Sequence, residues 1–161
     1  MGPEGVSAES VQGLDRRLEL WTRGIYMMQD FAFTGVGLGM VEQVMPLLYP
    51  TFLIPLNAGI DHVHNLYLQF GAELGYPGLI LLLASLMLLS ALAWRGVQRA
   101  RGTSWAPLAT GIWGILIALM VHGLVDAVPL EPEVYLLTWA IFGLAVALDT
   151  GLIAGELGPD A

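Results

Sequence analysis

Three long apolar stretches constrain the fold of this chain more than any other feature of its sequence. They are Leu74 to Trp94, Trp105 to Val125, and a shorter run from Val134 to Asp149. The first carries no charged side chain, and the second carries only His122. A helix needs about 20 predominantly apolar residues to cross a bilayer. The sequence therefore predicts an all-α membrane protein with three transmembrane helices within residues 65–153.

The charges of the two connecting segments predict the orientation in the membrane. Residues 95–104 hold three arginines and no acid, whereas residues 126–133 hold three acids and no base. Loops rich in Lys and Arg stay in the cytoplasm, so we expect the first segment inside and the second outside. Residues 14–64 then form an extracytoplasmic head and residues 154–161 a cytoplasmic tail. We expect a multi-pass protein of the cytoplasmic (inner) membrane.

The composition excludes several classes of function. The formal net charge is −8, with six arginines and no lysine, which argues against a nucleic-acid partner because a phosphate backbone requires a basic surface. The chain contains no cysteine, so disulfides, thiolate metal sites and a cysteine nucleophile are excluded.

The N-terminal region raises the question of how the head crosses the membrane. Residues 1–13 lack the basic start and apolar core of a secretory signal, and we expect them to form a disordered tail. A polar head crosses more easily after preceding membrane helices. We therefore expect the chain to be the C-terminal portion of a larger membrane protein, or a split partner of one.

The head is predicted to begin with an amphipathic helix. Apolar residues recur at spacings of four and three, at Leu14, Leu18, Trp21, Ile25 and Met28. At 100° per residue, Arg17 lies at the edge of this stripe, while Arg16 and Arg23 lie on the opposite face. Arg17 therefore borders whatever packs on the stripe. The alternative is that all three arginines face solvent or lipid headgroups.

Gly35, Gly37 and Gly39 end this helix in the sequence Gly-Val-Gly-Leu-Gly. A nucleotide-binding loop would need a preceding strand and a following helix with a Lys or acidic partner, and neither is found. The glycines instead predict a tight turn in which two backbones approach closely. Residues 40–61 are apolar and interrupted by three prolines, which predicts an interfacial loop rather than one continuous helix.

The segment that begins at His64 combines polar and small residues on separate faces. If it is helical, one face carries His64, Leu68, Gly71, Gly75 and Gly78, and the other carries Asn65, Gln69 and Glu73. Small residues four apart suit close helix contact, and the polar face does not suit lipid. We therefore expect this helix to pack on protein or a water-filled cavity, and Pro77 to kink or start the membrane span.

His64 is the leading candidate for chemistry. A histidine with an ordinary pKa of about 6.5 can abstract a proton at neutral pH. Asn65 or Glu73 could orient its ring or the substrate. The alternative is a structural histidine whose hydrogen bonds serve only the fold.

A metal site is a further interpretation of the same segment. Asp61, His62 and His64 offer carboxylate and imidazole ligands of the kind that zinc uses. A further ligand would have to come from His122 or Asp126. We therefore expect no metal and no other cofactor. His122 and Asp126, four residues apart, are instead predicted to face each other on a helix as a polar contact.

Four motifs in the chain resemble one known family when they are taken together. They are Arg17-Leu-Glu-Leu-Trp21, Gly35-Val-Gly37-Leu-Gly39, His64-Asn65-x9-Gly75-Tyr76-Pro77-Gly78 and His122-Gly-Leu-Val-Asp126. With them, residues 14–148 resemble the C-terminal conserved region of the O-antigen ligase and O-antigen polymerase family. The histidine-asparagine-glycine motif is the specific part of this resemblance.

The resemblance implies a polytopic glycosyltransferase of surface polysaccharide assembly. It would move a glycan from an undecaprenyl-diphosphate carrier to a hydroxyl of an acceptor glycan, lipid or protein, without a metal. Arg17 would bind the diphosphate, and His64 would take the proton of the acceptor. The supporting positions would be Asn65, Glu73, Gly75, Gly78, His122 and Asp126.

Size is where the chain departs from this family. Family members have more spans before this region, so we expect residues 1–161 alone to be inactive without further helices or a partner chain. A non-catalytic remnant or accessory subunit that packs on a larger polytopic partner is the alternative. A metal-dependent membrane hydrolase is a third possibility.

Overall fold

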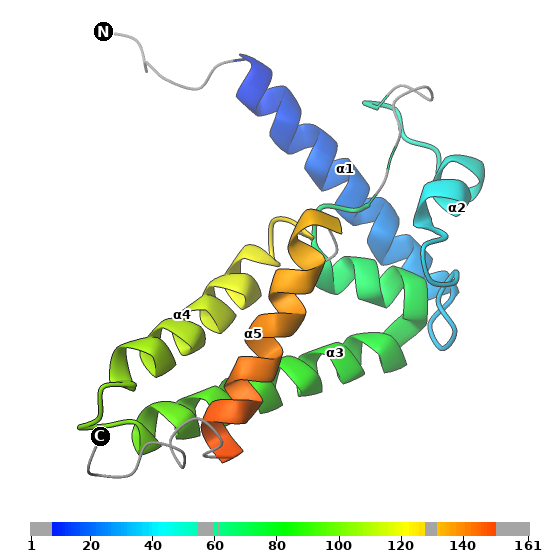
Figure 1. The fold of residues 1–161 in the computed structure, drawn as a ribbon. Coiled ribbons are helices and arrows are strands. Elements are labelled where there is room, and N and C mark those ends of the chain that lie inside the picture. Colours follow the sequence, from blue (N-terminus) through cyan, green and yellow to red (C-terminus); the bar gives the residue numbers. More distant parts are fainter. Residues whose placement is uncertain (1–7, 55–59, 61, 128–131, 151–161) are drawn as a thin grey trace, which may run out of the picture. The chain divides into compact units, whose positions relative to one another are not determined.

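The computed structural model describes residues 8–54, 60, 62–127 and 132–150, and within these residues it contains only helices and irregular segments (Figure 1). The helices are α1 (Ala8–Asp30), α2 (Val41–Leu48), α3 (Leu66–Arg99), α4 (Ala106–His122) and α5 (Pro132–Thr150). The prediction of an all-α fold is confirmed for this part of the chain.

Helix α3 is the one helix among the described residues that is long and apolar enough to cross a membrane, judged by length and composition. Only 17% of its most apolar stretch is buried, whereas the core helix of a soluble protein would be mostly buried. Helix α4 and residues Val134–Thr150 of α5 are apolar but shorter. The three-span arrangement and its orientation therefore remain predictions.

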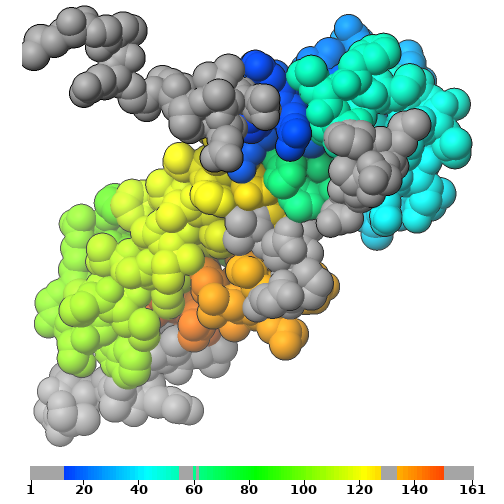
Figure 2. All heavy atoms as spheres, turned by 90° about the horizontal axis from the view of Figure 1, so that it is seen from above, coloured from blue at the N-terminus to red at the C-terminus, as the bar shows by residue number. Residues whose placement is uncertain are grey.

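The chain divides into two compact units, Met1–Ile80 with Val125–Ala127 and Leu81–Leu124 with Val128–Ala161. In the first unit, α1, α2 and the start of α3 pack around one apolar core, and Figure 2 shows their blue, cyan and green surfaces in contact. The buried members of this core are Leu20, Met27, Val41, Met45, Val63 and Ala72. Burying these side chains stabilises the arrangement of the three helices.

In the second unit, the C-terminal part of α3 packs with α4 and α5. The buried core consists of Ala93, Ala100, Ala109, Ile112, Leu116, Ile141, Ala145 and Leu148. Small residues allow the helices to approach closely, and a Cβ added at Gly96 would lie 2.9 Å from Cβ of Leu148.

An ion-pair cluster joins α3 and α5 within this second unit. Nε of Arg95 and Nη1 of Arg99 each lie 3.0 Å from Oδ1 of Asp149. Both arginines were predicted to lie in a loop after the helix, and this prediction was wrong because α3 continues to Arg99. Asp149, which lies within α5, is therefore held by two ion pairs.

Helix α1 begins earlier than predicted, at Ala8, so residues 8–13 are helical rather than part of a disordered tail. The stretch from Ala8 to Gln12 contains neither Gly nor Pro, which are the residues least favourable in helices. Residues 1–7 lie outside the described residues. Within the predicted loop 40–61, the eight-residue helix α2 forms around Pro46, so no single long helix occupies the described part of that loop.

The glycine-rich turn contacts α3 through its backbone. The N–H of Val36 donates to the carbonyl of Ala72 at 2.9 Å. The N–H of Gly37 donates to the carbonyl of Glu73 at 3.0 Å. Gly35 has a φ of 64°, and a Cβ there would lie 2.1 Å from the backbone of Glu73. The predicted close approach of two backbones is confirmed.

A break in α3 at Gly75 creates the acceptors that this turn uses. Gly75 has φ 69° and ψ −169°, outside the helical region. In a regular helix the carbonyls of Ala72 and Glu73 would accept from residues 76 and 77. The N–H of Tyr76 instead donates to the carbonyl of Ala32 at 2.7 Å, and Pro77 has no N–H. Both carbonyls are therefore free to accept hydrogen bonds from the glycine-rich turn. The kink lies at Gly75, two residues before Pro77, which was predicted to cause it.

Replacing Gly35 by alanine is expected to destabilise the first unit more than replacing Gly39. Both residues have positive φ, which costs a non-glycine residue about 1–2 kcal/mol. Only at Gly35 would the new Cβ also collide with the backbone of α3, because nothing lies within 4 Å of a Cβ at Gly39. We expect the midpoint of thermal unfolding, followed by tryptophan fluorescence in detergent, to fall several degrees further for Gly35→Ala. Equal shifts for the two variants would contradict the role of the close approach.

Candidate functional site

His64 lies just before α3, not on the helical face predicted for it. Helix α3 begins at Leu66, and Asn65 caps it with a side-chain Oδ1 that accepts the N–H of Leu68 at 2.9 Å. His64 itself has a φ of 50°, a left-handed value that is uncommon outside glycine. Its carbonyl accepts a hydrogen bond of 3.0 Å from the indole Nε1 of Trp21 in α1. Helix α1 therefore helps to fix the backbone at the candidate base.

A buried polar chain fixes the backbone on the other side of His64. Oε1 of Gln69 accepts the N–H of Val63 at 2.9 Å, and Nε2 of Gln69 donates to Oε1 of Glu73 at 2.7 Å. Gln69 and Glu73 are 3% and 6% exposed, so the predicted polar face is covered by protein rather than lipid. Glu73 therefore supports the segment that carries His64 through its hydrogen bond with Gln69.

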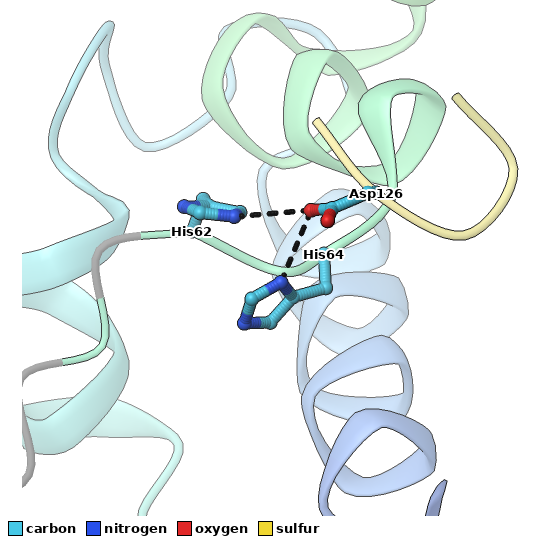
Figure 3. A group of neighbouring side chains, drawn as sticks. All are labelled: His62, His64 and Asp126. Atoms are coloured by element: carbon cyan, nitrogen blue, oxygen red, sulfur yellow. Dashed lines mark hydrogen bonds and ion pairs between the residues drawn. The ribbon is translucent and has the colours of Figure 1, made fainter. Parts of the chain in front are cut away.

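Asp126 brings the two neighbouring histidines together, as Figure 3 shows. Its Oδ1 lies 3.1 Å from Nδ1 of His64 and 3.3 Å from Nε2 of His62. The same oxygen accepts the N–H of Ala127 at 2.9 Å. The two imidazole rings are 4.3 Å apart between centroids. One carboxylate oxygen thus lies within hydrogen-bond distance of three nitrogens.

Asp126 does not face His122 on a helix, so the predicted contact between them was wrong. Helix α4 ends at His122, so the chain is no longer helical at Asp126 and the four-residue spacing does not bring the two side chains together. His122 is exposed at the helix end. The partners of Asp126 come from the segment before α3, which spacing along the sequence does not reveal.

The surroundings of Asp126 keep its carboxyl group ionised. Burial acts to raise the pKa of this carboxyl, but the N–H of Ala127 and the two histidines outweigh it, and the pKa lies below its ordinary value. An ionised Asp126 favours the tautomer in which Nδ1 of His64 carries the proton. Nε2 then lies on the opposite edge of the ring, away from the carboxylate, as the proton acceptor (Figure 3).

A pocket of about 280 Å³ lies beside these histidines in the first unit. Its lining residues are Gly13, Arg16, Arg17, Leu20, Ile54, Ile60, His62 and His64. The pocket brings together Arg17 and His64, the two residues predicted to bind and to react. Arg16 lines it as well, although it was expected to lie on the opposite face of its helix.

Arg23 has a structural role away from this pocket. Its guanidinium lies 3.6 Å from Glu19 and 5.5 Å from the ring centre of Phe52. The Glu19 carboxylate also accepts the backbone N–H groups of Phe52 and Leu53 at 2.6 and 2.9 Å. These contacts hold Phe52 and Leu53, which precede the pocket residue Ile54, against α1.

The remaining predicted positions serve the fold of α3 or lie outside the described residues. Gly75 forms the kink, and a Cβ added at Gly78 would lie 2.2 Å from Cβ of Leu74. Asp61 is among the residues that are not described. The ligand atoms of His62, His64 and Asp126 lie within 4.8 Å of one another, so of the two residues considered from the sequence as a further ligand, Asp126 is the one that lies beside both histidines.

Replacing Gln69 by leucine is expected to loosen the segment that carries His64. The N–H of Val63 and the carboxyl of Glu73 would lose their shared partner in a buried place, at a cost of about 1–3 kcal/mol. We expect a lower midpoint of thermal unfolding in detergent. As a control, Gln98→Leu on the same helix but in the second unit should change stability by less than about 0.5 kcal/mol. If both variants unfold like the unmodified chain, the polar chain does not stabilise this segment.

Comparison with known proteins gives one finding for this region. Residues 4–83 match the family model described as O-Antigen ligase, which confirms the family resemblance drawn from the motifs. The matched range contains α1, the glycine-rich turn and His64, whereas the motif at residues 122–126 lies beyond it. Neither a curated protein nor a solved structure matches the chain.

Proposed function

We propose that the chain, whose residues 4–83 match the model of the O-antigen ligase family, joins a glycan to an acceptor hydroxyl and takes the glycan from an undecaprenyl-diphosphate carrier. The family suggests activity of the glycosyltransferase type and a location in membranes of the cell envelope. The observation that carries the proposal is the single pocket lined by both Arg17 and His64.

The arginine side of the pocket suits the carrier diphosphate. A guanidinium group is planar and always charged, and it donates two parallel hydrogen bonds to phosphate oxygens. Arg16 and Arg17 both line the pocket, so two such groups are available to a group that carries several negative charges. Negative charge grows on the diphosphate as the glycosidic bond breaks, and fixed cations stabilise that transition state.

The histidine side of the pocket suits the acceptor hydroxyl. The Asp126 carboxylate hydrogen-bonds Nδ1 of His64 at 3.1 Å, which fixes the ring and stabilises the imidazolium that forms after proton transfer. His64 is the proposed catalytic base and Asp126 its positioning residue. This arrangement requires no metal for the transfer.

The proposed reaction is a single displacement at the anomeric carbon. The acceptor oxygen forms a new bond to that carbon, and the bond from the carbon to the diphosphate oxygen breaks. The electron pair of the broken bond leaves with the diphosphate, which Arg17 binds. The proton of the acceptor hydroxyl moves to Nε2 of His64, so atoms and charges balance.

Replacing His64 by alanine is expected to reduce glycan transfer by at least about 100-fold, the usual contribution of a general base. The variant replaces the chain in its native membrane, so that any partner helices are present. Gel analysis of surface glycan joined to its acceptor gives the readout, and immunoblotting gives the abundance of the chain. If surface glycan is still assembled at the normal rate by a normally abundant variant, His64 is not the base.

Arg17→Ala is expected to reduce transfer by about 100-fold or more, because a preorganised group that stabilises developing charge is lost. Arg101→Ala is the matched control, since Arg101 is an exposed arginine of the second unit that does not line the pocket. We expect normal transfer from the control. Loss in both variants would indicate a general effect of positive charge on the membrane protein.

The same experiment separates an enzyme from an accessory subunit. An accessory subunit that only packs on a larger partner would tolerate both His64→Ala and Arg17→Ala. It would instead lose its partner when Gly75, whose place is too tight for a Cβ, is replaced by leucine. Glycan transfer by normally abundant His64→Ala and Arg17→Ala variants distinguishes the two outcomes, because Gly75→Leu disturbs the kink of α3 in either case.

A further inference from the structure

We propose that His62, His64 and Asp126 form a binding site for a zinc ion, and that zinc bound there inhibits glycan transfer. The ligand atoms of the three side chains lie within 4.8 Å of one another in the first unit. The binding part of this inference stands on geometry. Its inhibitory part rests on the proposed function, in which His64 is the base.

The measured distances fit a tetrahedral zinc centre. Zinc lies about 2.0–2.1 Å from imidazole nitrogen and carboxylate oxygen, which places neighbouring ligand atoms of a tetrahedron about 3.3 Å apart. Oδ1 of Asp126 lies 3.1 Å from Nδ1 of His64 and 3.3 Å from Nε2 of His62. Two of the three ligand-to-ligand distances therefore already have the required length. Only the two imidazoles must approach each other.

The surrounding structure holds these ligands in place before any ion arrives. The carbonyl of His64 is bound by Trp21, and the N–H of Val63, between the two histidines, is bound by Gln69. The N–H of Ala127 orients the carboxylate, as outer hydrogen bonds do for metal ligands in proteins. The left-handed φ of His64 is the kind of local strain that is kept at functional sites.

The ligand set selects zinc over the abundant hard cations. Two imidazoles and one carboxylate suit zinc and similar transition metals, whereas magnesium and calcium prefer oxygen ligands alone. Three protein ligands leave a fourth position for water. Arg16 and Arg17 line the same pocket and repel a cation, so we expect weaker binding than at a structural zinc site.

Zinc at this place would remove the base from the reaction. The ion would bind Nδ1 of His64, and the other ring nitrogen, Nε2, would then carry the proton of the neutral imidazole. Nε2 could no longer accept a proton from the acceptor hydroxyl. Asp126 would bind the ion instead of supporting the imidazolium. Both effects lower the rate of transfer.

The binding test uses Co²⁺ as a spectroscopic probe on the full chain purified in detergent with its native membrane partners. We expect saturable binding of one Co²⁺ ion per chain, seen as a visible absorption band. Zn²⁺ should remove this band, and excess Mg²⁺ should not. His62→Ala and Asp126→Asn should each weaken binding at least about 10- to 100-fold, as expected when a metal site is damaged. His122→Ala, which changes the exposed third histidine, should bind as the unmodified chain does.

The activity test follows transfer in membranes at increasing free Zn²⁺. We expect zinc to inhibit transfer and a chelator to reverse this inhibition. The chelator alone should not lower the activity. The activity that His62→Ala retains should resist zinc. No saturable Co²⁺ binding, or equal binding by His62→Ala and the unmodified chain, would overturn the site. Activation by zinc, loss of activity with the chelator, or bound zinc without inhibition would overturn the inhibitory role. The Co²⁺ spectrum measures binding without glycan transfer. A chain that binds Co²⁺ but does not transfer glycan would therefore contradict the proposed function and leave the metal site intact.

Discussion

The hydrogen bonds between the glycine-rich turn and the broken part of α3 determine the arrangement of the first unit. Pro77 cannot donate to Glu73, and Tyr76 donates to Ala32, so two helix carbonyls need donors from elsewhere. Val36 and Gly37 supply them, which requires two backbones to touch at a place where a Cβ of Gly35 would collide. The glycines of one motif and the glycine-proline pair of the other therefore depend on each other. This explains why the two motifs occur in one chain.

The site follows from this arrangement because the segment before α3 is held from two sides. Trp21 of α1 binds the backbone at His64, and Gln69 of α3 binds the backbone at Val63. Asp126 then adds a fixed negative charge beside the two histidines. Burial strengthens the contact between Val63 and Gln69, since water competes less for its donor and acceptor, whereas the other two contacts are only partly buried. The position of the His64 backbone is thus fixed by Trp21 and Gln69, whereas the negative charge beside its ring comes from Asp126.

The sequence predicted what depends on local pattern and missed what depends on distant contacts. The apolar runs predicted α3, α4 and α5, the amphipathic stripe predicted α1, and glycine spacing predicted the tight turn, because all of these depend on neighbours along the chain, whereas α2 formed in a segment predicted to be a loop. The kink was assigned to Pro77 rather than Gly75, since the deciding contact comes from Ala32. Asp126 was assigned to His122, because nothing in the sequence tells that α4 ends before it. The helical register likewise could not reveal that Arg16 would line the same pocket as Arg17.

The position of Asp126 in the chain has a consequence for biogenesis. This residue follows α4 and returns to the first unit, 62 positions after His64. At a synthesis rate of about 5–20 residues per second, the carboxylate is made roughly 3–12 seconds after the histidine that it binds. During this interval the nascent chain has the arginines and the histidines but lacks the anion that orients them. The site is therefore completed only after α4 has been synthesised, so that its assembly is linked to the synthesis of this apolar helix.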